Sequence, residues 1–203
     1  MSEIYNTRAP NCFIIRFENL HEEIFQIIMK HILLAFICLV FAAPLAFGQI
    51  DRAAIDAQRG EMKKLDAMIG KWQGAGWIQQ GKERETFTGA ENVQRKIDGL
   101  AILVEGRFVD KKDVVIHETL AVLSYNSTSK DYDFNTFLAN GRKGQYTMKA
   151  TETGWQWGFS FPGGTVRYDI KLTGDTWHEA GEMSMDEGKT WKPFFEMTLK
   201  KVQ

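Results

Sequence analysis

The sequence lacks an excess of charge of either sign, since 25 Lys and Arg residues stand against 26 Asp and Glu, for a net charge of -1. Without a basic run there is no electrostatic footprint for nucleic acid, and we expect no nucleic-acid partner. The nucleophile elbow, the zinc-binding His-Glu-x-x-His pattern and the phosphate-binding loop are also missing from the sequence. We therefore expect neither catalytic residues nor metal ligands of a familiar kind.

Long apolar runs and cysteines are scarce as well. The one strongly apolar stretch, residues 32–41, is too short for a comfortable transmembrane helix. It follows Met29-Lys30-His31 and precedes a small-residue segment ending at Gly48, which is the pattern of a secretory signal peptide over residues 29–48. We predict cleavage between Gly48 and Gln49, and export to the periplasm or the medium. An uncleaved anchor and a buried core helix are the alternatives.

Residues 1–28 precede this signal and carry Glu18, Glu22 and Glu23 where a signal peptide should be basic. We interpret them as an upstream extension that results from start-site choice, with synthesis beginning at Met29. A genuine tail that forms a short helix continuous with the signal is the alternative. Both cysteines, Cys12 and Cys38, lie before the cleavage site, so the exported chain must rely on its core, with no stable membrane anchor after cleavage.

The remaining chain begins with helical spacing and then changes its period. Residues 49–69 place apolar side chains three or four apart, which predicts a short helical lead-in. From residue 70 to 203 the apolar pattern alternates, and nine turn signals separate segments of roughly ten residues. Ten strands joined by hairpins should close on themselves to hide their edges. We therefore predict an all-β fold, an antiparallel up-and-down barrel of about ten strands, with a β-sandwich as the alternative.

The start of the first strand carries a family resemblance. Residues 70–77, Gly-Lys-Trp-Gln-Gly-Ala-Gly-Trp, resemble the Gly-x-Trp start of lipocalin-like (calycin) barrels. The order of later motifs, including His117-Glu118 and Trp177-His178-Glu179, is similar to domain of unknown function 1579. The resemblance implies a barrel with an internal ligand cavity and no established activity. Trp72 would plug the closed end, covered by Lys200 or Lys201.

A second resemblance is to haem-binding nitrobindin barrels, through Gly70, Trp72, Gly74 and Gly76. The segment that should follow differs from the family pattern, because Trp77-Ile78-Gln79-Gln80 stand in its place. Haem would need an axial ligand, and His117 and His178 are the imidazoles of the predicted exported chain. We expect no cofactor, with haem as the alternative.

Residues 184–191, Ser-Met-Asp-Glu-Gly-Lys-Thr-Trp, match the Asp-box pattern Ser-x-Asp-x-Gly-x-Thr-Trp. In sialidase propellers this motif recurs from blade to blade, whereas one copy cannot build a propeller. Asp186 can accept hydrogen bonds from turn N–H groups and Gly188 can adopt a positive φ. We expect a hairpin stabiliser here.

The function that these features favour is binding of a small apolar or amphipathic molecule inside the barrel. Glu179 shares a strand face with Trp177, and an inward carboxylate needs a partner such as Arg107 or Arg167. A barrel without a cavity, an acid–base enzyme of hydrolase or isomerase type that pairs one His with a distant Glu, and an interaction module are the alternatives. The predicted ligand-binding residues are Trp77, Trp155, Trp157, Trp177, Glu179, His178 and Arg107.

Overall fold

The computed structural model describes residues 24–32 and 51–202. Residues 24–32 form a short helix with exposed side chains, in which His31 Nδ1 lies 2.6 Å from the carbonyl oxygen of Ile27. The helix includes the end of the predicted extension and the start of the predicted signal peptide, whose apolar core after residue 32 and cleavage site lie outside the described residues. Among the residues that are described, no helix has both the length and the apolar character needed to cross a membrane.

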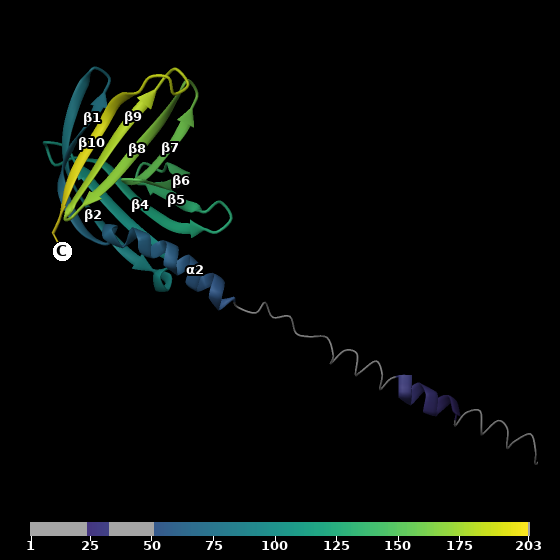
Figure 1. Cartoon of the computed structure of the whole chain (residues 1–203). Helices are drawn as coiled ribbons and strands as arrows, with labels where there is room; N and C mark the ends of the chain where they lie inside the picture. The colour runs from purple at the N-terminus through teal and green to yellow at the C-terminus, as the bar shows by residue number, and fades with distance from the viewer. Residues whose placement is uncertain (1–23, 33–50, 203) are drawn as a thin grey trace, which may run out of the picture. The chain divides into compact units, whose positions relative to one another are not determined.

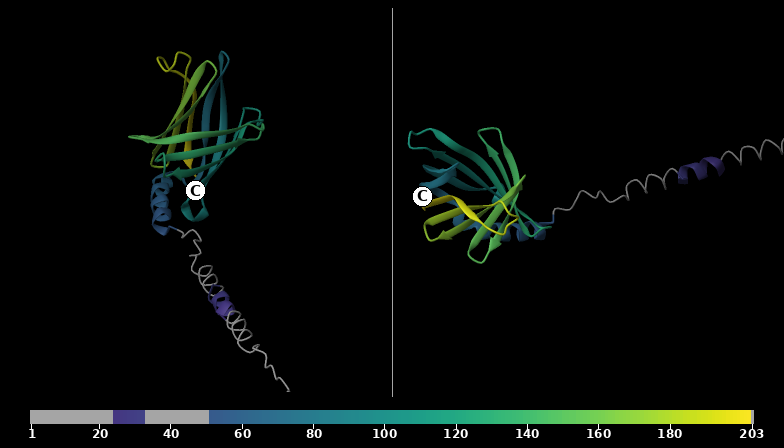
Figure 2. Two further views of the ribbon diagram at one scale, coloured as in Figure 1. Left: turned by 90° about the vertical axis from the view of Figure 1, so that its right-hand side faces the viewer. Right: turned by 90° about the horizontal axis from the view of Figure 1, so that it is seen from above.

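From Asp51 onward the chain forms a separate compact unit. Its main part is a closed antiparallel barrel of ten strands, as predicted from the turn spacing (Figure 1). Each strand pairs with its neighbours in sequence, and β1 closes the barrel against β10. The strands are β1 Gly70–Gln80, β2 Glu83–Lys96, β3 Ala101–Val109, β4 Val115–Asn126, β5 Asp131–Leu138, β6 Lys143–Thr151, β7 Gly154–Phe161, β8 Gly164–Thr173, β9 Thr176–Ser184 and β10 Lys192–Lys201. Figure 2 shows them winding around a common axis. Every strand is paired on both sides, and the shortest pairing is between β6 and β7, where it covers only residues 148–151 and 154–157.

The predicted helical lead-in is confirmed, as the α-helix α2 Arg52–Met62 followed by the 3-10 helix η1 Lys63–Met68. The Asp51 side chain caps α2 by accepting a hydrogen bond from the N–H of Ala54 at 3.0 Å. The change of helix type comes after Met62 and not at Gly60, where the sequence is weakest for a helix. In Figure 1, α2 lies at the end of the barrel where the C-terminus also lies.

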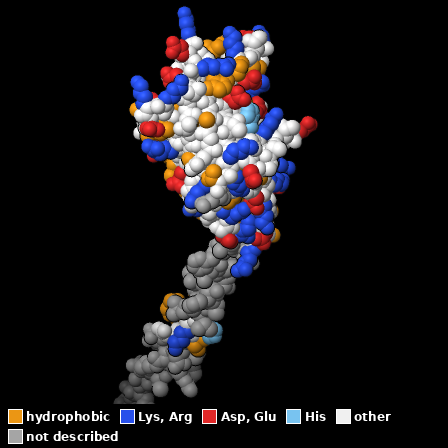
Figure 3. Space-filling view, turned by 90° about the vertical axis from the view of Figure 1, so that its left-hand side faces the viewer, with side chains coloured by type: hydrophobic (Ala, Val, Ile, Leu, Met, Phe, Trp, Pro, Cys, Tyr) orange, Lys and Arg blue, Asp and Glu red, His pale blue; other side chains and the backbone are white. Residues whose placement is uncertain are grey.

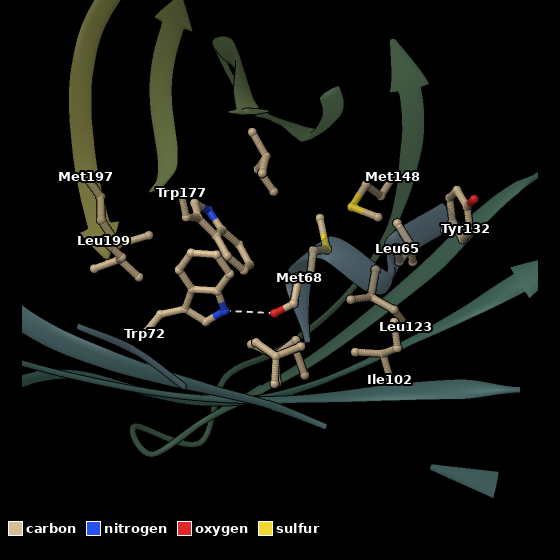
Figure 4. Packing of buried hydrophobic residues seen from close by; sticks show 14 of the residues in the cluster. Leu65, Met68, Trp72, Ile102, Leu123, Tyr132, Met148, Trp177, Met197 and Leu199 are labelled. Atoms are coloured by element: carbon tan, nitrogen blue, oxygen red, sulfur yellow. Dashed lines mark hydrogen bonds between the residues drawn. The ribbon is translucent and has the colours of Figure 1, made fainter. Parts of the chain in front are cut away.

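The lead-in closes this end of the barrel with apolar side chains. Met62, Leu65 and Met68 are buried among residues from strands on several sides (Figure 4). The hydroxyl of Tyr132 on β5 donates to the carbonyl of Glu61 at 3.1 Å, which ties α2 to the wall. The closed end is therefore filled, and any space inside the barrel must lie beyond it.

Trp72 occupies the position expected of a plug. Its side chain is 0% exposed, its Nε1 donates to the carbonyl of Met68 at 2.8 Å, and its ring meets Trp177 edge-on with centroids 5.7 Å apart (Figure 4). Of the two candidate cover residues, Lys201 places its Nζ 5.2 Å from the centroid of the Trp72 ring, whereas Lys200 bonds the hydroxyl of Thr176. The plug interpretation of the Gly-x-Trp segment is thus confirmed by burial and contacts.

The Asp-box segment forms the β9–β10 turn. Asp186 accepts hydrogen bonds from the N–H of Thr190 at 2.8 Å and from its hydroxyl at 2.6 Å. These bonds, together with one from Ser184, lower the pKa of Asp186 to about 2. The indole of Trp191 donates to the carbonyl of Gly188 at 3.1 Å. The motif acts on its own hairpin, as expected from a single copy.

Candidate binding cavity

Alternation along the strands sends one face of each strand into the barrel, and the inner faces leave a cavity of about 440 Å³. That volume lies within the range of small-molecule sites. Its wall is mostly apolar and aromatic, with Met68 and Trp177 toward the closed end and the exposed Arg142 and Lys143 of the β5–β6 hairpin also lining it. The alternative of a completely filled barrel does not fit this geometry.

Aromatic rings from four neighbouring strands contact one another on the wall. Trp157 on β7 stacks on Tyr168 on β8 with ring centroids 4.2 Å apart and planes 8° from parallel. Phe134 meets the Trp157 ring edge-on at 5.0 Å, and Tyr146 lies 5.2 Å from it. These four rings offer flat, polarisable surfaces to a molecule in the cavity.

Inward glycines give such rings room to lie against the sheet. A Cβ atom on Gly89 would lie 2.0 Å from the Phe108 ring, and one on Gly76 would lie 2.5 Å from the Phe87 ring. Gly76 belongs to the glycine-rich start of β1, so this glycine serves the wall and not a ligand-binding turn. Glycine at these positions keeps the large rings flat and the space between opposite walls open.

Glu179 lies on the cavity wall and is buried, with only 8% of its surface exposed. The indole N–H of Trp157 donates to its Oε1 at 3.2 Å. Burial raises the pKa of Glu179 to about 7, although the nearby N–H groups of Trp157 and Trp177 lower it in part. The partner is therefore an indole and not an arginine, because Arg107 is exposed and Arg167 pairs with Glu182 at 2.6 Å. The predicted Arg partner was wrong, since both arginines occupy outward positions of their strands.

Glu91, which the sequence analysis did not single out, is a second carboxyl on this wall. It is half-buried on β2, opposite Trp72 and Gly106 in the strand register. Burial and then the charge of Glu179 raise the pKa of Glu91 to about 8. The two carboxyls thus interact, and at neutral pH they share fewer than two negative charges.

Three of the predicted binding residues lie on the outer face and do not reach the cavity. Trp77 donates from Nε1 to Glu196 Oε2 at 3.1 Å, and the guanidinium of Arg84 lies 3.7 Å above its ring. His178 places Nε2 3.0 Å from Glu196 Oε1, and Arg107 is exposed on β3. Because Trp72 faces inward, Trp77 five positions later must face outward. On the face in Figure 3, basic and acidic side chains are interspersed.

Trp155, Trp157, Trp177 and Glu179 do share the inner face. Trp157, Trp177 and Glu179 line the cavity, whereas Trp155 packs against the core without lining it. The structure therefore brings three of the seven predicted residues together at one wall, and it adds Glu91 to them.

The fit of a haem depends on which imidazole faces inside. His178 is engaged with Glu196 on the outer face, so it cannot act as an axial ligand in the cavity. His117 lines the cavity near Phe108, with ring centroids 5.8 Å apart, at a position of β4 that is still exposed to solvent; partial burial lowers its pKa and favours the neutral ring. A neutral ring is the form that binds iron, and of His117 and His178 it is His117 that lies on the cavity wall. Among residues 24–32 and 51–202, no group of three or more His, Cys, Asp or Glu is placed to hold a metal ion.

The fold and the cavity together define a lipocalin-like, or calycin-like, barrel. No protein-family profile matches the sequence, and no curated protein matches it either. The barrel is similar to the crystal structure of Rv2717c from M. tuberculosis, with a TM-score of 0.57 and 10% identity over 70% of this chain and 98% of that one. The S-type phycobiliprotein lyase CPES from Guillardia theta aligns with a TM-score of 0.49 and 12% identity over 72% and 97% of the two chains. The likeness to Rv2717c shows a shared fold, and a shared fold does not fix function.

Proposed function

We propose that this barrel binds a small, largely apolar molecule in its interior. The observation that carries the proposal is the cavity of about 440 Å³ with aromatic walls and a filled closed end. Transfer of apolar surface from water to such walls contributes about 25 cal/mol per Å², so contact area alone can supply useful affinity. Trp157 and Trp177 line the space, which makes their emission a reporter of occupancy.

A fluorescence titration with the neutral dye Nile red tests the proposal. The purified protein should bind it with 1:1 stoichiometry, and indole emission should change in parallel. Ala121 lines the cavity and is 2% exposed, whereas its neighbour Leu120 is 40% exposed on the outer face. Ala121→Trp should fill the cavity and abolish binding, and Leu120→Trp should leave it intact. The smaller change Ala121→Leu should weaken binding if the Trp variant does not fold.

Equal binding by the Ala121→Trp and Leu120→Trp variants would place the dye outside the barrel and contradict the proposal. So would a wild-type protein that does not respond to the dye at all.

Haem is the second candidate, because His117 lies on the cavity wall. A haem titration of the wild type, His117→Ala and His178→Ala distinguishes the candidates by the Soret band. A sharp band that is lost only in His117→Ala would favour haem binding. No such band in the wild type would leave the apolar ligand as the function.

We also propose that the protein is exported after cleavage between Gly48 and Gln49. Support comes from the signal-like residues 29–48 and from the start of the barrel unit at Asp51, close after the predicted cleavage site. N-terminal sequencing of the cellular product should begin at or near Gln49. A product that retains residues 1–28 would contradict both export and the start at Met29.

A further inference from the structure

The cavity wall carries two acidic groups that no basic side chain neutralises. In the described part of the chain, neither Glu91 nor Glu179 forms a salt bridge with Lys, Arg or His. The hydrogen bond from Trp157 Nε1 to Glu179 is an interaction with a neutral donor. A buried carboxylate is costly unless a cation or several donors stabilise it, so this wall favours an incoming positive charge.

Two further polar atoms on the same wall are buried and make no hydrogen bond of ordinary geometry in the described residues, although the second, an indole N–H, lies close enough to Glu179 to lower its pKa. They are Thr136 Oγ1 and Trp177 Nε1, in residues that are 7% and 4% exposed. The first can donate or accept and the second can only donate. An unmade hydrogen bond at a buried atom costs free energy, which a ligand or a water molecule in the cavity can recover.

The aromatic rings beside the carboxyls suit a cation as well. Trp157 binds Glu179 through its indole N–H and presents its face to Tyr168, next to Phe134 and Tyr146. Ring faces attract ammonium groups, most strongly where water is excluded. A carboxyl beside aromatic rings on one wall suits a protonated nitrogen attached to an apolar body.

We propose that the ligand of this cavity is an amphipathic amine, whose protonated nitrogen binds the Glu91–Glu179 pair while its apolar part lies against the aromatic wall. This inference rests on the proposed function and narrows it to one class of molecule. Binding converts a protonated carboxyl to a carboxylate paired with the ammonium, and the displaced proton leaves to solvent.

Other titratable groups that face the cavity could also affect the binding of an amine. Tyr146 and Tyr168 lie beside the pair, and burial raises the pKa of Tyr168, so its hydroxyl stays protonated. His117 is neutral near pH 7 because burial lowers its pKa. Arg142 and Lys143 also line the cavity but are exposed, so water and salt screen their repulsion of an amine. His178 acts from the outer face, where it slightly favours ionised Glu179.

Calorimetry with three molecules of one shape tests the inference: phenylbutylamine, phenylbutanol and phenylbutanoate. The amine should bind most tightly, and its affinity should rise about tenfold from pH 6 to pH 8, the change in ionised fraction of a carboxyl with a pKa of about 7. Phenylbutanol should show no such rise. Titration in two buffers of different ionisation enthalpy should reveal proton release with the amine alone.

Two substitutions test whether the preference for the amine depends on Glu179. Glu179→Gln should remove the preference for the amine and keep phenylbutanol binding, whereas Glu118→Gln, an equal change of charge at an exposed position of β4, should leave the preference intact. If phenylbutanol binds as well as the amine, the inference fails and the proposed function stands. If phenylbutanoate binds best, Arg142 and Lys143 determine the ligand and the inference is wrong. If none of the three binds, the proposed function fails too.

Discussion

The carboxyl pair makes the stability of the ligand-free protein depend on pH in a direction opposite to that of ordinary surface acids. The pKa of Glu91 rises to about 8 and that of Glu179 to about 7, both from an ordinary value of 4.5. The folded state therefore holds these protons more tightly than the unfolded state. The stabilisation is complete below the unfolded value of 4.5 and is lost as pH rises through about 7 and 8.

The magnitude follows from about 1.4 kcal/mol for each tenfold change in proton affinity. If the whole pKa shift of Glu91 acted on stability, this residue alone would contribute about 5 kcal/mol to the free energy of unfolding. Much of that contribution is already lost as the pH rises from 4.5 to 6.5. Glu91 is only half-buried and faces the cavity, where water lowers the penalty for its charge. We therefore expect the free energy of unfolding to fall by about 2 kcal/mol between pH 6.5 and pH 9.

Denaturant titration across that interval measures this fall. His117, whose lowered pKa acts in the opposite direction, has completed its effect near pH 6.5, so it does not mask the result. The double variant Glu91→Gln, Glu179→Gln should show a nearly flat profile, and Glu118→Gln should retain the wild-type slope. A wild-type stability that is constant or rises from pH 6.5 to pH 9 would refute the reasoning about the pair.

Four other substitutions test the fold and the site. Trp72→Ala removes the buried plug and should destabilise the protein by about 3 to 5 kcal/mol in denaturant titration, and a loss under about 1 kcal/mol would place Trp72 outside the core. Gly89→Ala should destabilise by about 1 to 3 kcal/mol because its Cβ would clash with the Phe108 ring, whereas Gly60→Ala, with open space around it in α2, should stabilise by up to about 1 kcal/mol. His178→Ala should leave Nile red affinity unchanged, since its side chain lies on the outer face.

The barrel could be predicted because turns and alternation are local signals. Each turn between two strands has a Gly, Asn or Asp within it or at the adjoining strand end, and the parity of Trp157 and Trp177 is visible in the strands that contain them. Trp77 was placed inside by its residue type, although the parity set by Trp72 sends it outward. The strand pattern was thus more informative than the preference of indole for buried sites.

The acid pair could be found only in part. Glu179 stood out because its neighbours on one face are apolar, whereas Glu91 follows Phe87 and Gly89 on β2, where glycine weakens the apolar alternation. That glycine is needed because the Phe108 ring, which comes from the next strand, lies over it. Interaction between Glu91 and Glu179 depends on closure of the barrel, which brings β2 and β9 around one space and which no local pattern contains.

A crystal structure with bromophenylbutylamine, in which the anomalous signal locates the bromine, tests directly whether the barrel cavity binds an amphipathic amine. We expect one bromine peak inside the barrel, against the wall formed by Trp157 and Tyr168, with the amine nitrogen within hydrogen-bond distance of Glu179 or Glu91. Bromine peaks confined to the outer surface, or a cavity filled only with water at saturating ligand, would contradict it.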